Sequence, residues 1–579
     1  MKDFEWILIP QASDFHIGSS YYPIHVGNHK LIINKQPERP FYSFEKDNSK
    51  LFLWGFPNFA NIKSGPDDLI NNYLEEGFKV FERIKGAWLG ILIDGDAIQI
   101  FNDKLGLYKF FYADLNEGII ASSDFWMISS LVPDGNVSKK NILTYLVKHY
   151  FIEDQTILEE VKKSLPASKL FLKNDLKEIS QYFSIDKLLK EATIENSNKD
   201  VIESALLLWK RLIKENIEGV NPDKLFLTLT GGLDSRLVLA GFKSQGVSPN
   251  TFTFGSSKSM DVMEAVRISE QLKLNHYPFD LRNDLKENFS NLAKENIKNG
   301  MSLISISRTF RNEAYKSLKG HASKLFFGFI GSEVLRGGVF PDGLMYSGLA
   351  TDYWSKQYSA ERNYLNYDFI ENNNESKIVI EGLISKKWMQ NPDSYIFNHI
   401  VPNHFAQDIN LINNIGIEGV CLFWDDDFVK FISKTSYFVD NSKKETLSTN
   451  GHLKRIQGPG FTCNLISKLD YDCAKLKLGK GYSPMDFHRS KYIAGLKYVF
   501  HKTLNVNSKP QMVLTYGAWY KNYLLDLFSN SNVEELGIKK PELLNSLKIH
   551  TGQTEKSYLI YTLIANLLLI NEEIKNCRS

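Results

Sequence analysis

The glycine-rich segment at residues 229–236 carries the side chains of this sequence that are best placed to do chemistry. It has the sequence Leu-Thr-Gly-Gly-Leu-Asp-Ser-Arg and follows an apolar run at residues 225–229 that predicts a buried strand. Gly231 and Gly232 cannot continue that strand, and helical spacing begins after them. Free backbone N–H groups and the helix dipole make such a helix start an anion site. The segment, from Leu229 onward, therefore predicts a phosphate-binding loop.

Four side chains of the loop indicate how a phosphate would be bound. Thr230 and Ser235 can donate hydrogen bonds from their hydroxyl groups. Asp234 would repel a phosphate directly, but a hard divalent cation such as Mg²⁺ can lie between its carboxylate and the phosphates. The guanidinium of Arg236 can clamp phosphate oxygens in pairs, or it can form a salt bridge on the helix surface. The side chains thus favour a phosphate that carries a metal ion.

Spacing excludes two common nucleotide-binding patterns. No Gly-Lys-Ser/Thr follows the loop, so it is not a Walker A segment, and the GxGxxG spacing of dinucleotide sites is missing. The remaining pattern, Ser/Thr-Gly-Gly-x-Asp-Ser, resembles the pyrophosphate loop of ATP pyrophosphatases, which release PPi and adenylate a carboxyl or carbonyl group. The alternative is a tight turn before an ordinary helix.

Whole-chain composition narrows the class of protein. The 579 residues are 43% apolar and 23% charged, as in soluble globular proteins, and this length favours two or more domains. The formal net charge of +2 gives no indication of nucleic-acid or membrane binding. The longest apolar stretch, residues 558–570, is too short to cross a bilayer and predicts a C-terminal packing helix. Without a signal-peptide pattern or paired cysteines at zinc spacing, the sequence favours a cytoplasmic protein.

The first third of the chain has the pattern of antiparallel sheets. Residues 1–190 contain short alternating and aromatic runs separated by turns, which predict sheets packed on one another. One helix is expected at residues 66–82. A polar stretch at residues 181–200 has the composition of a linker, and a second domain is expected over residues 200–579.

In the second domain, strands alternate with helices, which predicts a parallel sheet with helices on both faces. Such sheets bind ligands at the carboxyl ends of their strands, where Thr230, Phe254 and Gly328 fall. Residues from about 390 to the C-terminus predict mostly helix. The acidic triplet at residues 425–427 is interpreted as a solvated helix start.

Several segments in this order resemble the asparagine synthetase family, with its β-lactam synthetase and lasso-peptide cyclase relatives. The loop matches the family pattern Leu-Ser-Gly-Gly-Leu-Asp-Ser, and this match is specific. The other matches are individually weaker and gain weight from their order; they lie at residues 105–112, 119–124, 251–255, 328–333 and 417–425.

The resemblance implies two domains and a nucleotide site. The first, residues 1–190, would be a class II glutamine amidotransferase-like β-sandwich of the Ntn-hydrolase type. The second, residues 200–579, would be an α/β ATP pyrophosphatase domain of the adenine nucleotide α-hydrolase-like type, with a helical C-terminal part. Implied ligands are ATP and Mg²⁺. The implied ATP-binding residues are Leu229, Thr230, Gly231, Gly232, Asp234, Ser235, Phe254 and Gly328.

Two further site residues follow from the resemblance. Asp234 and Glu333 would hold Mg²⁺, although Ser332 replaces the family's aspartate, Phe329 replaces an acidic or polar residue, and Glu333 can instead cap a helix. Lys480 stands roughly where the family places a catalytic lysine that stabilises developing charge; the alternative is an exposed loop lysine. Arg236 is the other candidate catalytic residue.

The first domain departs from the family at its nucleophile. The family's glutaminase half uses an N-terminal cysteine thiolate, whereas Lys2 stands here and no cysteine occurs in residues 1–420. We therefore expect this domain to be inactive toward glutamine.

The sequence prediction is an amide-bond ligase that cleaves ATP to AMP and PPi. A small-molecule or peptide carboxylate would be adenylated and then attacked by ammonia or a substrate amine. The alternatives are asparagine synthesis from aspartate and ammonia, and a non-catalytic regulatory homologue that binds ATP. Neither nucleic acid nor a membrane is an expected partner, and a homodimer is compatible with the sequence.

Overall fold

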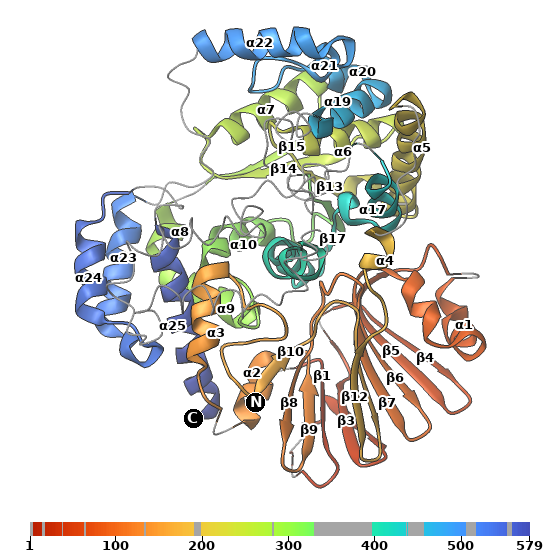
Figure 1. Ribbon diagram of the computed structural model, residues 1–579, viewed down its shortest axis with the longest axis vertical. Helices are drawn as coiled ribbons and strands as arrows, with labels where there is room; N and C mark the ends of the chain where they lie inside the picture. Colours follow the sequence, from red (N-terminus) through yellow and green to blue (C-terminus); the bar gives the residue numbers. More distant parts are fainter. Residues whose placement is uncertain are drawn as a thin grey trace.

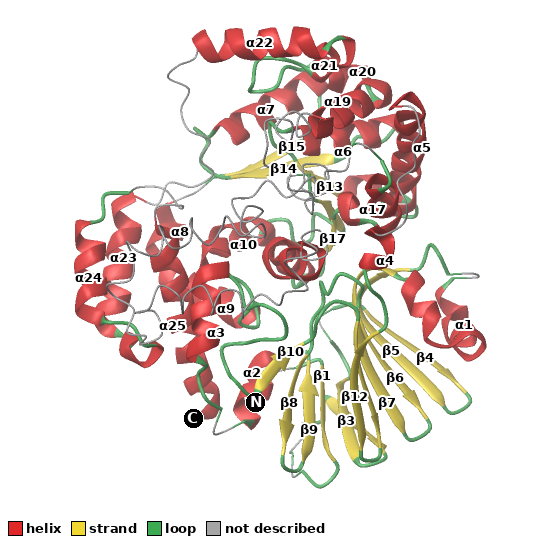
Figure 2. Cartoon of the chain, viewed as in Figure 1, coloured by secondary structure: helices red, strands yellow, loops and turns green. Residues whose placement is uncertain are grey.

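The computed structural model describes residues 4–328, 396–435, 437, 457–504, 517–552 and 558–579, with short gaps at residues 14, 16–17, 38, 63–64, 133–134, 190–197 and 281–282 (Figure 1). Lys2, Phe329, Ser332 and Glu333 lie outside the described residues. The described chain is a mixed α/β protein that contains two antiparallel sheets and a parallel sheet (Figure 2).

Two six-stranded antiparallel sheets form the first domain. Their strand orders are β10-β8-β9-β1-β3-β2 and β12-β11-β7-β6-β5-β4. The strands are β1 Trp6–Pro10, β2 Tyr21–Val26, β3 His29–Asn34, β4 Phe41–Lys46, β5 Ser49–Asn58, β6 Lys85–Asp94, β7 Ala97–Asn102, β8 Phe111–Leu115, β9 Gly118–Ser122, β10 Val161–Lys163, β11 Ser168–Lys173 and β12 Leu176–Gln181.

Both faces of each sheet are covered, which explains why several strands are apolar without alternation. Between the sheets, Trp6 and Leu31 of the first pack with Trp54 and Ile91 of the second. The outer face of the second sheet packs against α1 (Leu69–Glu76). The outer face of the first packs against α2 (Phe125–Leu131), α3 (Lys139–Lys148) and the C-terminal helix α25 (Leu559–Arg578). The result is a four-layer sandwich of helix, sheet, sheet and helix.

The second domain is built on a five-stranded parallel sheet of order β15-β14-β13-β16-β17. Helix α6 (Leu233–Ser244) connects β13 to β14, and α7 (Met260–Leu272) connects β14 to β15. The predicted strand, loop and helix around Gly231 are confirmed, and β13 is buried along its whole length. β17 is a strand inside the stretch expected to be mostly helical. The strands are β13 Leu225–Thr228, β14 Asn250–Phe254, β15 His276–Phe279, β16 Lys324–Phe326 and β17 Glu418–Val420.

The remaining elements are helical. The α-helices are α4 Asp186–Leu189, α5 Asn198–Ile217, α8 Asn283–Glu287, α9 Phe289–Asn299, α10 Thr309–Lys316, α16 Ala406–Asn413, α17 Asp426–Ser433, α19 Gln457–Leu469, α20 Tyr471–Lys475, α21 Pro484–Arg489, α22 Lys491–Leu504, α23 Gly517–Asn530 and α24 Lys540–Ile549. The segment η8 Ile396–Phe405 is a π-helix, and the 3-10 turns are η1 Pro66–Asp68, η2 Gly77–Arg83, η3 Pro222–Lys224, η4 Ile306–Arg308, η9 Leu422–Trp424 and η11 Val533–Leu536.

The C-terminal helix α25 joins the two parts of the molecule. Its Asn566 accepts a hydrogen bond from the backbone of Ile306 at 2.9 Å and donates one to the hydroxyl of Tyr145 at 2.6 Å. Arg578 donates to the carbonyl oxygens of Ser129 and Gly135. The packing helix predicted near residues 558–570 is therefore confirmed. Across the described ranges, no helix has both the length and the apolarity that crossing a membrane requires.

Candidate nucleotide-binding site

The glycine loop lies at the carboxyl end of β13, the central strand of the parallel sheet. β13 ends at Thr228, and α6 begins at Leu233 with Gly232 as its N-cap. The Ser235 hydroxyl accepts the Thr230 N–H at 3.2 Å and lies 3.1 Å from the Thr230 carbonyl oxygen, to which it donates. The Gly232 N–H donates to the Thr230 hydroxyl at 3.2 Å. The two hydroxyls predicted as phosphate donors thus hold the loop in shape.

Two glycines allow neighbouring elements to approach the loop closely. A Cβ atom at Gly231 would lie 2.9 Å from Cβ of Glu264 in α7. A Cβ atom at Gly328, just after β16, would lie 2.5 Å from Cα of Ser235 and 2.7 Å from the carbonyl oxygen of Thr228. The Gly328 N–H donates to the Thr228 hydroxyl at 2.8 Å. The ends of β13 and β16 and the first turn of α6 are therefore packed backbone to backbone.

Two carboxylates stand at the loop. Asp234 lies in the first turn of α6 and is 8% exposed. Asp261 lies in the first turn of α7 and accepts a hydrogen bond from the Gly231 N–H. Burial raises the pKa of the Asp261 carboxyl above its ordinary value, and this hydrogen bond partly offsets the rise. Sequence reasoning missed Asp261. The available signal was its place just after β14, at the same edge of the sheet as the loop.

The donor atoms at the loop fit Mg²⁺. Mg²⁺ prefers oxygen ligands and is usually held by one or two protein carboxylates, together with phosphate and water oxygens. Asp234 and Asp261 supply such carboxylates. In the described part of the chain, no group of three or more His, Cys, Asp or Glu side chains is arranged to hold a metal on its own. A magnesium ion at this loop would therefore depend on the oxygens of a bound nucleotide.

Phe254 ends β14 at the ligand edge of the sheet and is half-buried. Its ring makes an edge contact with Tyr315, with the ring centroids 5.8 Å apart, and the guanidinium of Arg311 lies 5.5 Å from its centre. Arg311 and Arg308 both form ion pairs with the buried Asp408, at 3.1 and 3.2 Å. Two guanidiniums therefore share the carboxylate of Asp408, and one of them, that of Arg311, lies beside Phe254.

Arg236 is fully buried and its guanidinium is directed at a distant segment. It donates to the carbonyl oxygens of Leu476 and Lys477, about 240 residues further along the chain. Burial lowers its pKa to about 10, so the group stays protonated at neutral pH. Arg267 of α7 donates to the same Lys477 carbonyl at 2.7 Å and pairs with Glu264. Arginines from α6 and α7 therefore hold one segment between them.

That segment leads into the turn that carries Lys480. The turn is closed by a hydrogen bond from the Leu478 N–H to the Tyr482 carbonyl at 2.7 Å. Leu478 and Tyr482 pack against Leu233, the first residue of α6. Lys480 itself is exposed. The turn thus covers the start of α6, and the structure brings Lys480 to the same end of the sheet as the glycine loop.

Comparison with known proteins identifies no family. No protein-family model matches the chain, and no curated protein matches it. Among solved structures, NMN synthetase from Francisella tularensis is 14% identical and covers 37% of this chain and 97% of its own, at a TM-score of 0.20. The glutamine PRPP amidotransferase from B. subtilis, solved with ADP and GMP, is 10% identical and covers 52% of this chain and 67% of its own, at a TM-score of 0.17. Likenesses at these scores are coarse.

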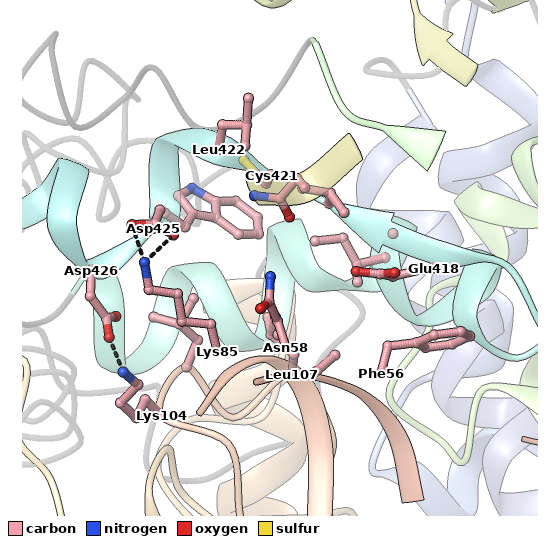
Figure 3. Close-up of a pocket in the computed structure, with 18 of the residues that line it drawn as sticks. Phe56, Asn58, Lys85, Lys104, Leu107, Glu418, Cys421, Leu422, Asp425 and Asp426 are labelled. Carbon is pink, nitrogen blue, oxygen red and sulfur yellow. Dashed lines mark hydrogen bonds and ion pairs between the residues drawn. The ribbon is translucent and has the colours of Figure 1, made fainter. Parts of the chain in front are cut away.

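A pocket separates the glycine-loop domain from the first domain (Figure 3). Its cavity volume is about 80 Å³. Lys85 and Lys104 come from the first domain, and Glu418, Asp425 and Asp426 come from β17 and the start of α17. The dashed lines in Figure 3 join the two domains: Lys85 contacts both carboxylate oxygens of Asp425, and Lys104 contacts Asp426.

These contacts correct the interpretation of the acidic triplet. Asp425 does cap α17, but its side chain is only 9% exposed and pairs with Lys85 at 3.0 Å. Asp426 pairs with Lys104, and Asp427 pairs with Lys85 at 2.9 Å. The triplet does begin helix α17, but its carboxylates form ion pairs between the two domains and are not simply solvated.

The contacts of Arg236 give a first prediction. Arg236→Met is expected to lower the free energy of unfolding by about 1–3 kcal/mol, because the substitution leaves a partly buried carbonyl oxygen at residue 476 without its donor. MgATP binding is expected to weaken as well, since a buried positive charge beside the loop is lost. Arg211→Met is the matched control, because Arg211 is 48% exposed and its ion pairs are expected to contribute under about 1 kcal/mol. Urea unfolding of both variants measures the difference, and equal effects would contradict the assigned contact.

Proposed function

We propose that this protein is an ATP-dependent amide-bond ligase of the asparagine synthetase type, which forms AMP and PPi. The observation that carries the proposal is the glycine loop at the carboxyl end of the central parallel strand, with Asp234 in the first turn of α6. A substrate carboxylate oxygen would attack the α-phosphorus of ATP, and the bond from that phosphorus to the β-phosphate oxygen would break. Ammonia or a substrate amine would then displace AMP from the acyl-adenylate.

Each part of the loop has a role in this reaction. The N–H groups and dipole at the start of α6 would bind the phosphates that leave as PPi, and the buried charge of Arg236 would add to the attraction. Asp234 and Asp261 would orient Mg²⁺. The bound ion supplies positive charge that offsets charge developing on the departing PPi. Phe254 would lie along the adenine, as the family resemblance implies.

Lys480 would stabilise negative charge on the acyl-adenylate and on the amide-forming intermediate. Lys480 would act from the turn that covers the start of α6. Arg236 and Arg267 hold the segment before this turn by hydrogen bonds to its backbone carbonyl oxygens. We therefore assign Arg236 a positioning role in addition to its charge. Glu333 stays a proposed metal ligand by the family resemblance alone, as an alternative to Asp261.

The first domain would keep an amidotransferase-like sandwich of the Ntn-hydrolase type without glutaminase chemistry. No cysteine occurs in residues 1–420, so that domain contains no thiol to attack an amide. Free ammonia or a substrate amine is therefore the proposed nucleophile. An amine within the same substrate would make the reaction a cyclisation.

The decisive experiment identifies the products of ATP cleavage. The ligase is expected to release AMP and PPi and to catalyse ATP–PPi exchange that depends on a carboxylic acid. The panel should contain amino acids, aspartate with ammonia among them, and peptides with free carboxyl groups. Lys480→Ala is expected to retain MgATP binding and to lower amide formation more than exchange. ADP and phosphate as products would overturn the assignment of the loop.

One observation favours a second candidate, a regulatory homologue that binds ATP without turnover. In the structure, the Gly231 N–H donates to a carboxylate rather than facing an open anion site. Tight MgATP binding with no exchange on any acid of the panel would support this candidate over the ligase.

A further inference from the structure

Helix α22 exposes an unusual amount of apolar surface. Of the 15 large hydrophobic residues that are exposed in the described chain, seven belong to this one helix. The most exposed are Tyr492 at 73%, Leu496 at 72%, Leu504 at 68% and Phe500 at 66%. Scattered exposed apolar residues are ordinary on a protein surface, but a concentration of this kind marks an interaction site.

Most of the exposed apolar residues of α22 lie on one face of the helix, and Tyr498 is the exception. Tyr492, Leu496 and Phe500 follow one another at intervals of four, and Val499 lies three residues after Leu496. Residues at these spacings lie side by side along a helix. Helix α22 runs along the outer edge of the molecule, with α7 and α21 below it (Figure 1). Its apolar face is therefore a continuous stripe at the periphery of the protein.

The opposite face of α22 is the one that packs against the protein. Ala494 is 2% exposed and belongs to the small cluster with Leu478 and Tyr482. A Cβ atom at Gly481 would collide with His501, so the helix lies directly on the turn that carries Lys480. The helix is thus held in place from below, and its apolar stripe is not needed for that packing.

The charge and length of α22 indicate which kind of partner could bind its apolar stripe. Residues 491–504 contain three lysines and no acidic residue, and Arg489 precedes them. Two copies of this helix packed on each other would bring like charges together. A helix of 14 residues is also only about 21 Å long, so its stripe offers much less than the roughly 800 Å² per partner of a stable protein interface. A second copy of the chain is therefore a poor fit.

We propose that the outer face of α22 is a docking surface for an anionic lipid bilayer. An apolar stripe with aromatic residues, bordered by lysines, is the composition of helices that lie in the plane of a membrane surface. Apolar side chains would enter the boundary between headgroups and acyl chains, and the exposed Lys491 would contact anionic headgroups, whereas Lys497 pairs with Asp486 at 2.6 Å. This attachment is peripheral. The formal net charge of the whole chain, +2, gives no sign of this surface, because the basic residues that border it are confined to residues 489–502.

Vesicle sedimentation of the full chain tests the proposal. Vesicles of phosphatidylcholine with phosphatidylglycerol are expected to bind the protein at least about tenfold more tightly than vesicles of phosphatidylcholine alone. The double variant Leu496→Glu, Phe500→Glu is expected to lose at least about tenfold in affinity, because two apolar anchors are replaced by charges that anionic lipid repels. No nucleotide is needed, so the result is independent of the proposed ligase activity.

The matched control is Leu207→Glu on α5, since Leu207 is 71% exposed but belongs to a different helix. It is expected to bind vesicles like the wild type. The proposal would be overturned if the wild-type protein did not bind anionic vesicles. It would also be overturned if the double variant bound them as tightly as Leu207→Glu does. Sedimentation velocity without lipid completes the test: a dimer that dissociates in the double variant, without vesicle binding by the wild type, would assign the stripe to a second copy.

Discussion

Asp234→Asn is expected to weaken MgATP binding by about 30- to 1000-fold, which corresponds to about 2–4 kcal/mol. The substitution keeps the shape of the side chain and removes its charge, at a position that is 8% exposed in the first turn of α6. The affinity for metal-free ATP should rise or stay unchanged in the variant, because the native carboxylate repels the phosphates. Calorimetric titrations with MgATP, and with ATP in the presence of a chelator, measure the two affinities.

Two aspartates serve as comparisons for this variant. Asp472 lies in the first turn of α20 and is exposed, so Asp472→Asn should bind MgATP like the wild type. Asp261→Asn distinguishes two roles of that carboxylate. A loss of MgATP affinity would make Asp261 a metal ligand, whereas a gain would mean that Asp261 competes with phosphate for the Gly231 N–H. Equal MgATP affinities for wild type and Asp234→Asn would remove Asp234 from the site.

The parts of this site that the sequence predicted are those set by neighbouring residues. The transition from β13 through Gly231 and Gly232 into α6 needs only a short apolar run, residues that break it, and helical spacing afterwards. The parallel sheet follows from the alternation of such strands with helices. The same local reasoning placed Thr230 and Ser235 in the loop but not their roles, because their hydrogen bonds close the loop on itself.

The parts that the sequence did not predict depend on contacts between distant residues. Arg236 stands next to the loop in sequence, yet its guanidinium reaches carbonyl oxygens at residues 476 and 477. The acidic triplet at residues 425–427 has the pattern of an exposed helix start, and only Lys85 and Lys104 of the other domain make it an interface. Contacts between distant residues determine which charged side chains are buried. The pattern of neighbouring residues in the sequence does not reveal these contacts.

The apolar stripe of α22 is exposed, although its sequence pattern is typical of a buried helix face. Its spacing predicts an amphipathic helix, and an apolar face in a sequence is normally assigned to the core. The structure instead uses the small face around Ala494 for packing and leaves the large side chains outside. Which face of a helix is buried follows from the size of the space beneath it. The turn at Gly481 leaves no room there for a large residue.

Gly328→Ala is expected to disturb the nucleotide loop although it adds a single methyl group. The new Cβ would lie 2.5 Å from Cα of Ser235 and 2.7 Å from the carbonyl oxygen of Thr228. Both are backbone atoms, of α6 and β13, so no side chain can move aside. Overpacking of this kind typically costs about 1–3 kcal/mol of folding free energy. Gly328→Val should cost more, because its two methyl groups need additional space.

The strain of Gly328→Ala must appear at the loop, because the atoms that collide with the new methyl belong to the loop's two flanks. We therefore expect MgATP affinity to fall by tenfold or more at temperatures where the variant is still folded. Gly495→Ala is the matched control: that glycine lies inside α22 with no atom within 4 Å of the added methyl, so the change should raise stability by about 0.5–1 kcal/mol through helix propensity. Urea unfolding without nucleotide gives the stability of both variants, and calorimetry gives their affinities. A Gly328→Ala protein with wild-type stability and affinity would mean that β16 does not press against the first turn of α6, and the close packing from which the site is built would have to be abandoned.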